Sequence, residues 1–327
     1  MSGVTQKSIR ASEDGMRLDR WFHLHFPQVS HGQLQKFLRK GQVRVDGGRS
    51  KASRRLLSGQ EVRIPPLPEQ AAADRPRQKN RLTQGDVEFI RSLVIHRDTH
   101  FIAINKPSGL SVQGGTGQER HVDGLLEGLK FDSDERPRLV HRLDRDTSGV
   151  LMLARSRQAA TLMGKMLKKR DTSKLYWAVA MGTPRPAQGQ IELALAKRKG
   201  RAGEKMQVCY EDEEDGQFAL TKYFVLQSAA QRFSFVALTP VTGRTHQLRV
   251  HMNEIGFPIV GDGKYGGADA HPGGEISRKL HLHARSFSFT DPDSGQLVTI
   301  RADLPDHMQN SFGLLGFDGS DKDNPFM

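Results

Sequence analysis

The sequence predicts an α+β protein, with a larger domain built on a mixed, mainly antiparallel sheet and preceded by a small α/β domain. Strand-like runs outnumber helical ones over most of the chain, which favours this class over a doubly wound sheet. The composition changes after Leu67, and 327 residues are enough for two hydrophobic cores. We therefore expect a small domain at 14–66, a linker at 67–88, a larger domain at 89–307 and a flexible tail at 308–327.

The small domain is expected to contain two helices followed by short strands. Apolar residues fall at helical spacing between Leu18 and Phe26, and Pro27 ends that pattern. Ser30 can cap a second helix, which Gly41 would end. Alternating apolar residues then predict strands at 43–45 and 62–64, with a tight-turn signal at Asp46-Gly47.

The larger domain shows many short strand patterns and two clear helical ones. Ser156 can cap a helix over 158–169, and Thr245 can cap one over 246–255 that ends at Gly256. Strands are expected at 93–96, 101–104, 150–154, 175–181, 207–210, 222–226, 233–238, 287–289 and 297–300.

Charge is concentrated in the small domain. The whole chain has a formal net charge of +12, and residues 16–64 contain eleven Lys and Arg against three Asp and Glu, a net of +8. This concentration favours a polyanionic partner such as a nucleic-acid backbone over a merely solvated basic face.

The remaining bulk properties are those of an ordinary folded protein. No apolar run approaches the ~18 residues of a membrane span, and residues 1–7 lack the apolar stretch of a signal peptide. The single cysteine, Cys209, excludes an internal disulfide and fits a reducing compartment. We expect a cytoplasmic protein without a membrane partner, and a monomer.

Four segments contain residues suited to chemistry, and each also has a plain structural interpretation. Asn105–Gly109 reads as a Pro-Gly turn. In His141–Gly149 an aspartate could accept hydrogen bonds in a turn, and in Lys174–Ala178 a strand tyrosine could be core packing. The arginines of Thr242–His251 could bind phosphate at a helix start.

Taken together, these four segments resemble the RluA-type pseudouridine synthases. Their order, followed by Gly256–Asp262, is similar to that family from about Leu93 to Arg301, and HRLD with GRTHQLR is its most specific signature. Residues 17–47 resemble the small RNA-binding domain named after ribosomal protein S-four. Segments 106–109, 114–117 and 141–151 are most similar to family members that act on large-subunit (23S) ribosomal RNA.

The resemblance implies a role for several residues. Asp144 would be the catalytic carboxylate, which attacks the sugar or abstracts its C2′ proton. Tyr176 would stack on the target uracil and help to remove its C5 proton, while Arg249 would pair with Asp144, hold it ionised and orient it. Arg142 would enter the RNA and keep the flipped nucleotide out of its stack. Further RNA contacts are expected from Lys106, Arg244 and His246, and in the small domain from Arg17, Lys36, Arg39, Lys40 and Arg44.

Cofactors and metals are not expected. The isomerisation needs neither redox chemistry nor an external group, and the histidines, including His281 with His283 and His246 with His251, lack a zinc-ligand pattern. Gly114–Gly117 lacks the Gly-Lys-Ser/Thr of a nucleotide-binding loop. Relatives commonly have Val-His where this chain has Val112-Gln113, which puts acid–base work there in doubt.

Three alternatives stay open at this point. The same chemistry could act on transfer RNA or another RNA, or the substrate could be an assembling particle rather than free ribosomal RNA. The chain could be a silent RNA-binding factor of ribosome assembly, which the presence of Asp144, Tyr176 and Arg249 argues against. A hydrolase that uses Asp144 with His141 is the most distant possibility, because no orienting partner is evident.

Overall fold

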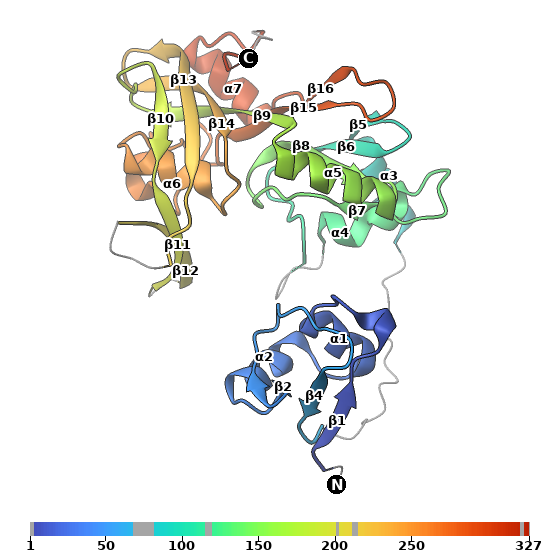
Figure 1. Ribbon diagram of the computed structural model, residues 1–327. Coiled ribbons are helices and arrows are strands. Elements are labelled where there is room, and N and C mark those ends of the chain that lie inside the picture. The colour runs from blue at the N-terminus through green and yellow to red at the C-terminus, as the bar shows by residue number, and fades with distance from the viewer. Residues whose placement is uncertain are drawn as a thin grey trace. The chain divides into compact units, whose positions relative to one another are not determined.

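The computed structural model describes residues 3–67, 82–114, 120–200, 203–210, 215–320 and 324–326. The chain forms two compact units, Met1–Arg81 and Leu82–Met327 (Figure 1). Most of the expected linker, 68–81, and residues 115–117 of the glycine-rich segment lie outside the described residues.

The first unit packs two helices against a four-stranded antiparallel sheet. Ser30 accepts a hydrogen bond from the backbone of Gln33 and caps the second helix, as predicted. The predicted turn is confirmed, because Asp46 and Gly47 both have positive φ, at 49° and 74°. The elements are β1 Thr5–Ser8, a 3-10 turn Ala11–Glu13, α1 Leu18–His25, α2 His31–Arg39, β2 Arg44–Val45, β3 Gly48–Arg49 and β4 Glu61–Ile64, with sheet order β1-β4-β2-β3.

The first unit begins earlier than predicted. Strand β1 pairs with β4 along its length, from Thr5 opposite Ile64 to Ser8 opposite Glu61, and Ile9 is buried in the core. The expected boundary at residue 14 is therefore wrong. The sequence of β1 is entirely polar because it forms an edge strand with solvent-facing side chains, so no apolar alternation marks it.

The second unit is built on a ten-stranded sheet, which confirms the predicted α+β class. Its main path runs β10-β13-β14-β9-β15-β8-β6-β5, with β16 paired to β15 and β7 paired to β8. Every strand pairing in this sheet is antiparallel except the one between β8 and β15. The strands are β5 Val94–Arg97, β6 Phe101–Lys106, β7 Arg138–Leu139, β8 Ser148–Ala154, β9 Thr172–Met181, β10 Gln188–Glu192, β13 Leu220–Ala229, β14 Phe233–Pro240, β15 Leu282–Thr290 and β16 Leu297–Arg301.

The parallel pairing is a seam between two halves of this sheet. Ser148 lies opposite His283, and Gly149 lies opposite Ala284. A Cβ on Gly149 would come within 2.2 Å of the Ala284 carbonyl oxygen, and the φ of Gly149 is +107°. Only glycine therefore allows β15 to approach β8 this closely. The seam brings the loop before β8 against strands from the other half.

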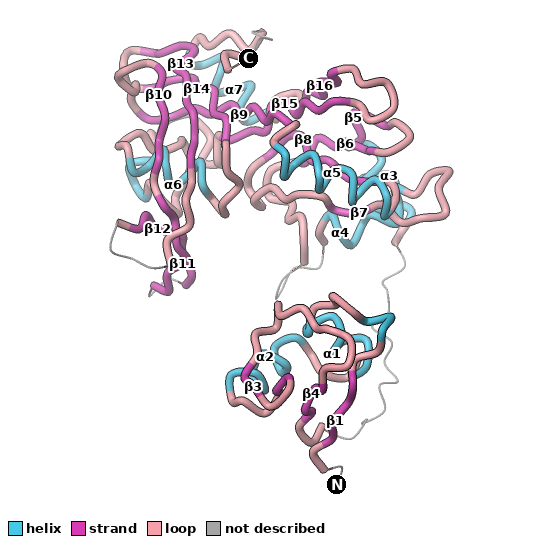
Figure 2. Tube along the Cα trace, viewed as in Figure 1, coloured by secondary structure: helices cyan, strands magenta, loops and turns pink. Residues whose placement is uncertain are grey.

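Helices cover both faces of each half of the sheet (Figure 2). In the first half, Leu151 and Leu153 pack toward α3 and α4, while Val150 and Met152 pack toward α5. In the second half, β9 and β14 bury one face against α6 and the other against α7. The helices are α3 Gln84–Ser92, α4 Val122–Leu125, α5 Arg157–Lys169, α6 Gln247–Glu254 and α7 Asp306–Leu315, with 3-10 turns at Leu126–Leu129 and Gly267–Ala270 and a separate hairpin of β11 Ala194–Gly200 and β12 Gly203–Cys209.

Three expectations about ends and caps were wrong. Residues 306–315 form α7, whose Met308 and Phe312 are buried, so the tail does not begin at 308. The linker does not extend to 88, because Thr83 caps α3 from Gln84. Thr245 is not the cap of α6, since His246 occupies that position in a left-handed conformation with φ of 55°.

Candidate active site

Asp144 lies on the loop that connects β7 to β8, and the loop is held from both ends. Leu143 and Thr147 are buried on either side of it. The turn after β6 forms two hydrogen bonds with the loop. The backbone N–H of Gly109 donates to the Arg145 carbonyl at 2.9 Å, and the Ser108 hydroxyl donates to the Asp146 carbonyl at 2.8 Å. Two of the four segments singled out in the sequence therefore form one structure around the aspartate.

Lys106 is part of this support and is not an RNA-binding residue. Its side chain is fully buried, and its ammonium donates to the carbonyl oxygens of Pro107, Leu110 and Arg145 at 2.8–2.9 Å. Burial lowers the pKa of Lys106 to about 7, against the opposing charges of Asp146 and Asp144. The structure argues against the expected RNA contact, because the side chain is buried and all three donors of the amine are used within the protein.

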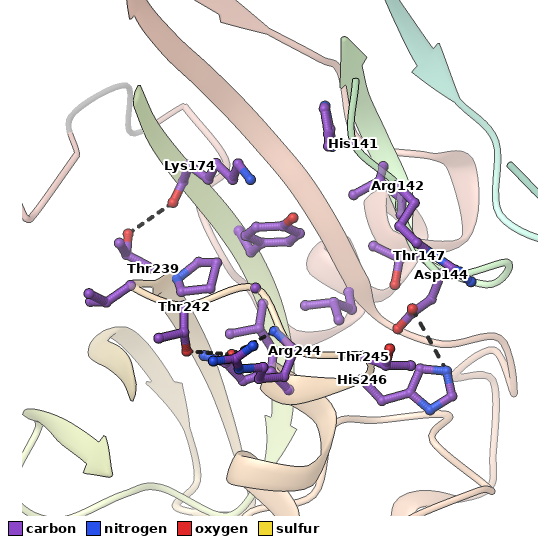
Figure 3. Close-up of a pocket in the computed structure, with 18 of the residues that line it drawn as sticks. His141, Arg142, Asp144, Thr147, Lys174, Thr239, Thr242, Arg244, Thr245 and His246 are labelled. Atoms are coloured by element: carbon purple, nitrogen blue, oxygen red, sulfur yellow. Dashed lines mark hydrogen bonds and ion pairs between the residues drawn. The ribbon is translucent and has the colours of Figure 1, made fainter. Parts of the chain in front are cut away.

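Asp144 lines a cavity of about 580 Å³, a size typical of small-ligand sites. Its walls come from the Asp144 loop, from the start of β9, from the end of β14 and from the turn that leads into α6 (Figure 3). The cavity brings together most of the catalytic-domain residues expected from the sequence, namely Arg142, Asp144, Tyr176, Arg244, His246 and Arg249.

Two side chains from α6 and its N-terminal turn approach the Asp144 carboxylate. His246 Nε2 lies 3.7 Å from Oδ1, and Arg249 Nη1 lies 3.9 Å from Oδ2. Figure 3 shows the side chains of Asp144 and His246 pointing toward one another. The carboxylate keeps part of its surface open to the cavity, so it has a positive neighbour in Arg249 without being enclosed.

Arg249 binds a second acid more closely than it binds Asp144. Its Nε and Nη2 donate to the two carboxylate oxygens of Asp262 at 2.8 and 2.7 Å, a bidentate geometry that fixes the guanidinium plane. Asp262 is 1 % exposed and also accepts from the backbone of Tyr265, whose ring lies 5.1 Å from the guanidinium. Burial acts to lower the pKa of Arg249, but the bonded Asp262 and the charge of Asp144 raise it on balance.

Burial favours the neutral form of His246 in this site. Burial lowers its pKa, with the charge of Asp144 opposing the shift. The ring is held at Nδ1 by the hydroxyl of Tyr265, at 2.6 Å, so that Nε2 faces Asp144. A neutral imidazole in this orientation can donate or accept one hydrogen bond at the cavity wall.

Tyr176 lies on β9, half-buried, with its ring on the cavity wall. Burial and the charge of Asp144 both raise the pKa of the Tyr176 phenol well above its ordinary value. The side chain is therefore a neutral aromatic surface at physiological pH, suited to stacking and to hydrogen-bond donation.

His141 has structural contacts with Met152 and Phe287 rather than with Asp144. Its Nε2 accepts a hydrogen bond from the backbone of Met152 at 3.0 Å, and its ring stacks on Phe287 with centroids 5.6 Å apart. Burial, together with the charge of Lys174, lowers the pKa of His141 to about 3. This structural role argues against a hydrolase in which His141 would activate Asp144.

The small unit brings together some of its expected RNA-binding residues. Arg17 and Arg39 line one surface groove, also formed by His31, Gln35 and Lys51. Lys36, Lys40 and Arg44 are not among its lining residues. Arg17 also pairs with Asp19 at 2.6 Å, and the guanidinium of Arg44 donates to the carbonyls of Gly41 and Gly47, so part of its capacity is used within its own turn.

Four residues near the site have no role that the sequence motifs assign: Thr147, Lys174, Asp262 and Tyr265. Asp262 and Tyr265 are set by contacts with α6 that no local pattern shows. The buried Thr147 hydroxyl has no hydrogen-bond partner and lines the cavity. In the part of the chain that the structure describes, no group of three or more His, Cys, Asp or Glu is arranged to hold a metal ion. None of the described helices is long and apolar enough to cross a membrane.

Comparison with known proteins identifies the family of this chain. A family model described as RNA pseudouridylate synthase matches residues 100–254. The chain is 33% identical to "Ribosomal large subunit pseudouridine synthase C" of Escherichia coli (strain K12), over 92% of this chain and 93% of that one. It is also 33% identical to "RNA pseudouridine synthase 4, mitochondrial" of Arabidopsis thaliana, over 94% of this chain and 81% of the other.

A solved structure gives the same result. "Human RNA Pseudouridylate Synthase Domain Containing 4" superposes with a TM-score of 0.60 at 28% identity, covering 71% of this chain and 97% of its own. The family resemblance predicted from the HRLD and GRTHQLR motifs is thereby confirmed. The chain belongs to the RluA-type family of RNA pseudouridine synthases and is an RNA-modifying isomerase.

Proposed function

We propose that this enzyme converts specific uridines of large-subunit (23S) ribosomal RNA, or of its assembly precursor, to pseudouridine in the cytoplasm. The observation that supports the reaction best is the convergence of Asp144, His246 and Arg249 within 4 Å at the wall of a nucleotide-sized cavity. The substrate is supported by the E. coli relative, which matches nearly the whole chain and bears the name of a large-subunit enzyme.

Asp144 is the proposed catalytic group. In the reaction the N1–C1′ bond of uridine breaks, the base rotates, C5 bonds to C1′, the C5 proton leaves and N1 gains a proton. An aspartate can drive bond cleavage by attacking C1′ or by taking the C2′ proton. Either step needs a carboxylate that is open to the sugar. Asp144 meets this need, because its cationic neighbour Arg249 forms its close hydrogen bonds with Asp262 instead.

Arg249 and His246 are the proposed positioning groups. Arg249 supplies a fixed positive charge near the carboxylate, because Asp262 holds its guanidinium in place. His246 offers a neutral ring nitrogen at 3.7 Å from the carboxylate. Preorganised groups of this kind stabilise charge without reorganising during the reaction.

Tyr176 and Arg142 are proposed to hold the flipped nucleotide. The Tyr176 ring provides a stacking surface, and its raised pKa opposes a role as the free base for the C5 proton. Tyr176 can assist that step only by passing its own proton on as it accepts another. Arg142 is exposed at the cavity and is free to enter the RNA where the base has left its stack.

The test is pseudouridine mapping of total RNA, by carbodiimide modification and primer extension, in cells with and without the gene. Sites missing from large-subunit ribosomal RNA, restored by the wild type but not by Asp144→Asn, are the expected result. Sites missing only from transfer RNA or from an organellar RNA would keep the chemistry and overturn the substrate. The mitochondrial name of the Arabidopsis relative makes such a shift of substrate a concrete alternative.

A further inference from the structure

Lys174 is a half-buried cation with no anionic partner among the residues that the structure describes. It lies on β9 and lines the Asp144 cavity. Among the residues that the structure describes, its ammonium has neither a hydrogen bond nor an ion pair, and Nζ lies 5.9 Å from the centroid of the Phe287 ring. Burial lowers the pKa of Lys174. A buried charge that no acid compensates destabilises the folded chain, so its presence calls for a ligand.

Arg170 supplies a second cation to the same cavity. This residue ends α5 in a left-handed conformation, with φ of 63° and ψ of 28°, and its side chain lines the same cavity. An arginine at this position also complements the helix dipole. That explanation does not extend to Lys174, which lies inside a strand. Thr172 adds a hydroxyl group to the same wall, and among the described residues that line the cavity Asp144 is the one acid.

The position of Lys174 relative to Tyr176 limits what it can bind. Residues i and i+2 of a strand point to the same face and are about 6.6 Å apart. This spacing is comparable with the separation of base and phosphate within one nucleotide. Lys174 lies across the cavity from Asp144 and His246 in Figure 3, so it is on the side away from the reacting sugar carbon.

We propose that Lys174 and Arg170 form a phosphate-binding subsite that holds the RNA backbone next to the flipped nucleotide. A phosphate offers the charge and the acceptor oxygens that suit two cations and a hydroxyl group lining one cavity. The subsite rests on the RNA isomerase activity and not on which RNA is modified. It fixes the strand at one end of the cavity while Asp144 acts at the other.

The test replaces single phosphates in an RNA fragment that the wild-type enzyme converts. Each phosphate flanking the target uridine is changed in turn to a neutral methylphosphonate, and KM and kcat are measured for the wild type and for Lys174→Met. At one phosphate we expect the wild-type KM to rise about 10- to 100-fold and the variant to show no further rise. Arg170→Met should show the same coupling at the same phosphate.

An increase in KM that Lys174→Met adds equally at every phosphate would overturn the proposal. A fall in kcat without a change in KM would also overturn it. Either result would assign Lys174 to contacts with the base or to the stability of the fold. Thermal unfolding provides the second measurement. Lys174→Met should unfold at a higher temperature than the wild type, because the unpaired charge is removed, whereas a lower unfolding temperature would indicate a structural role. Lys130→Met, outside the cavity, is the matched control and should change neither KM nor the methylphosphonate profile.

Discussion

Arg249 donates two hydrogen bonds to Asp262, at 2.8 and 2.7 Å, while its third nitrogen faces Asp144 at 3.9 Å. The buried Arg249 guanidinium thus forms hydrogen bonds with Asp262 and only a longer ion pair with Asp144. The bidentate partner holds the guanidinium in place, and the looser one keeps its carboxylate available to a substrate. Asp262 is therefore expected to matter to the reaction although it does not line the cavity.

Asp262→Asn should disturb both the fold and the site. The amide keeps the shape but removes the charge, and its NH₂ would face a guanidinium that also only donates. Breaking a buried pair in this way costs about 3–5 kcal/mol of unfolding free energy. Urea unfolding should show that loss, and kcat should fall. Asp269→Asn, an exposed acid seven residues further along the chain, is the control, and equal effects of the two substitutions would contradict the assignment.

Asp144→Asn should abolish turnover and leave RNA binding nearly intact. The change is isosteric and removes only the reacting charge, so a fall of at least about 10³-fold in kcat is expected. Single-turnover kinetics and a binding titration measure the two quantities separately. Asp146→Asn, two residues away and exposed, should retain activity. Comparable turnover by the Asp144 variant would refute its catalytic role.

Lys106→Met should impair catalysis without weakening the affinity for RNA. The substitution removes the ammonium donor from the carbonyls of Pro107, Leu110 and Arg145, of which Arg145 keeps the N–H of Gly109, and it loosens the loop that carries Asp144. We expect a loss of about 1–3 kcal/mol in unfolding free energy and a lower kcat. The dissociation constant for RNA should stay unchanged because the amine is buried. A weaker RNA complex with unchanged stability would indicate that Lys106 binds RNA directly.

The large unit should lose stability as the pH falls from about 6.5 to 4. Burial lowers the pKa of His281 and of His283 to about 4, so both stay neutral in the fold while the unfolded chain takes up protons. Their contribution is complete above the unfolded pKa and is lost as the pH approaches the folded one, by about 3 kcal/mol for each residue.

Urea unfolding at a series of pH values measures this slope. His281→Gln should remove at most about a third of it, because His283 and His141, whose pKa is lowered to about 3, also keep their native forms neutral over this range. A slope that His281→Gln does not change would show that other groups cause the acid sensitivity.

Neutralising the basic face of α2 should weaken RNA binding in a salt-dependent way. Lys36→Gln, Arg39→Gln and Lys40→Gln together remove three charges, and each RNA phosphate that is no longer neutralised lowers the slope of log K against log[salt] by about 0.7–0.9. The folded state should persist because all three side chains lie outside the core of the first unit. A salt slope equal to that of the wild type would remove α2 from the RNA interface.

Local signals in the sequence predicted the elements whose causes are local. Ser30 and Ser156 cap the helices that they were expected to cap, and the turn at Asp46 follows from residues that tolerate positive φ. Strand β1 escaped prediction because its stability comes from pairing with β4, some 55 residues away, and not from its own polar side chains.

The residues of the site also divide into those that local sequence predicts and those that depend on tertiary packing. Asp144, Tyr176 and Arg249 belong to motifs that a single sequence can match to a family, and the structure places all three on one cavity. The burial of Lys106 and the hydrogen-bonded ion pair between Arg249 and Asp262 depend on how distant segments pack. A lysine beside a Pro-Gly turn and an aspartate in a loop are ordinarily exposed, so nothing local in the sequence indicates that both are buried.

The glycine seam between β8 and β15 also sets the order in which this enzyme can become active. Asp144 belongs to the half of the sheet that is synthesised first, whereas Tyr176, His246 and Arg249 belong to the half that is synthesised later. Strand β15, which joins the halves, ends only at Thr290. A growing chain therefore carries Asp144 long before Tyr176, His246 and Arg249 can pack beside it, and the cavity that these four residues share forms only after β15 has been synthesised.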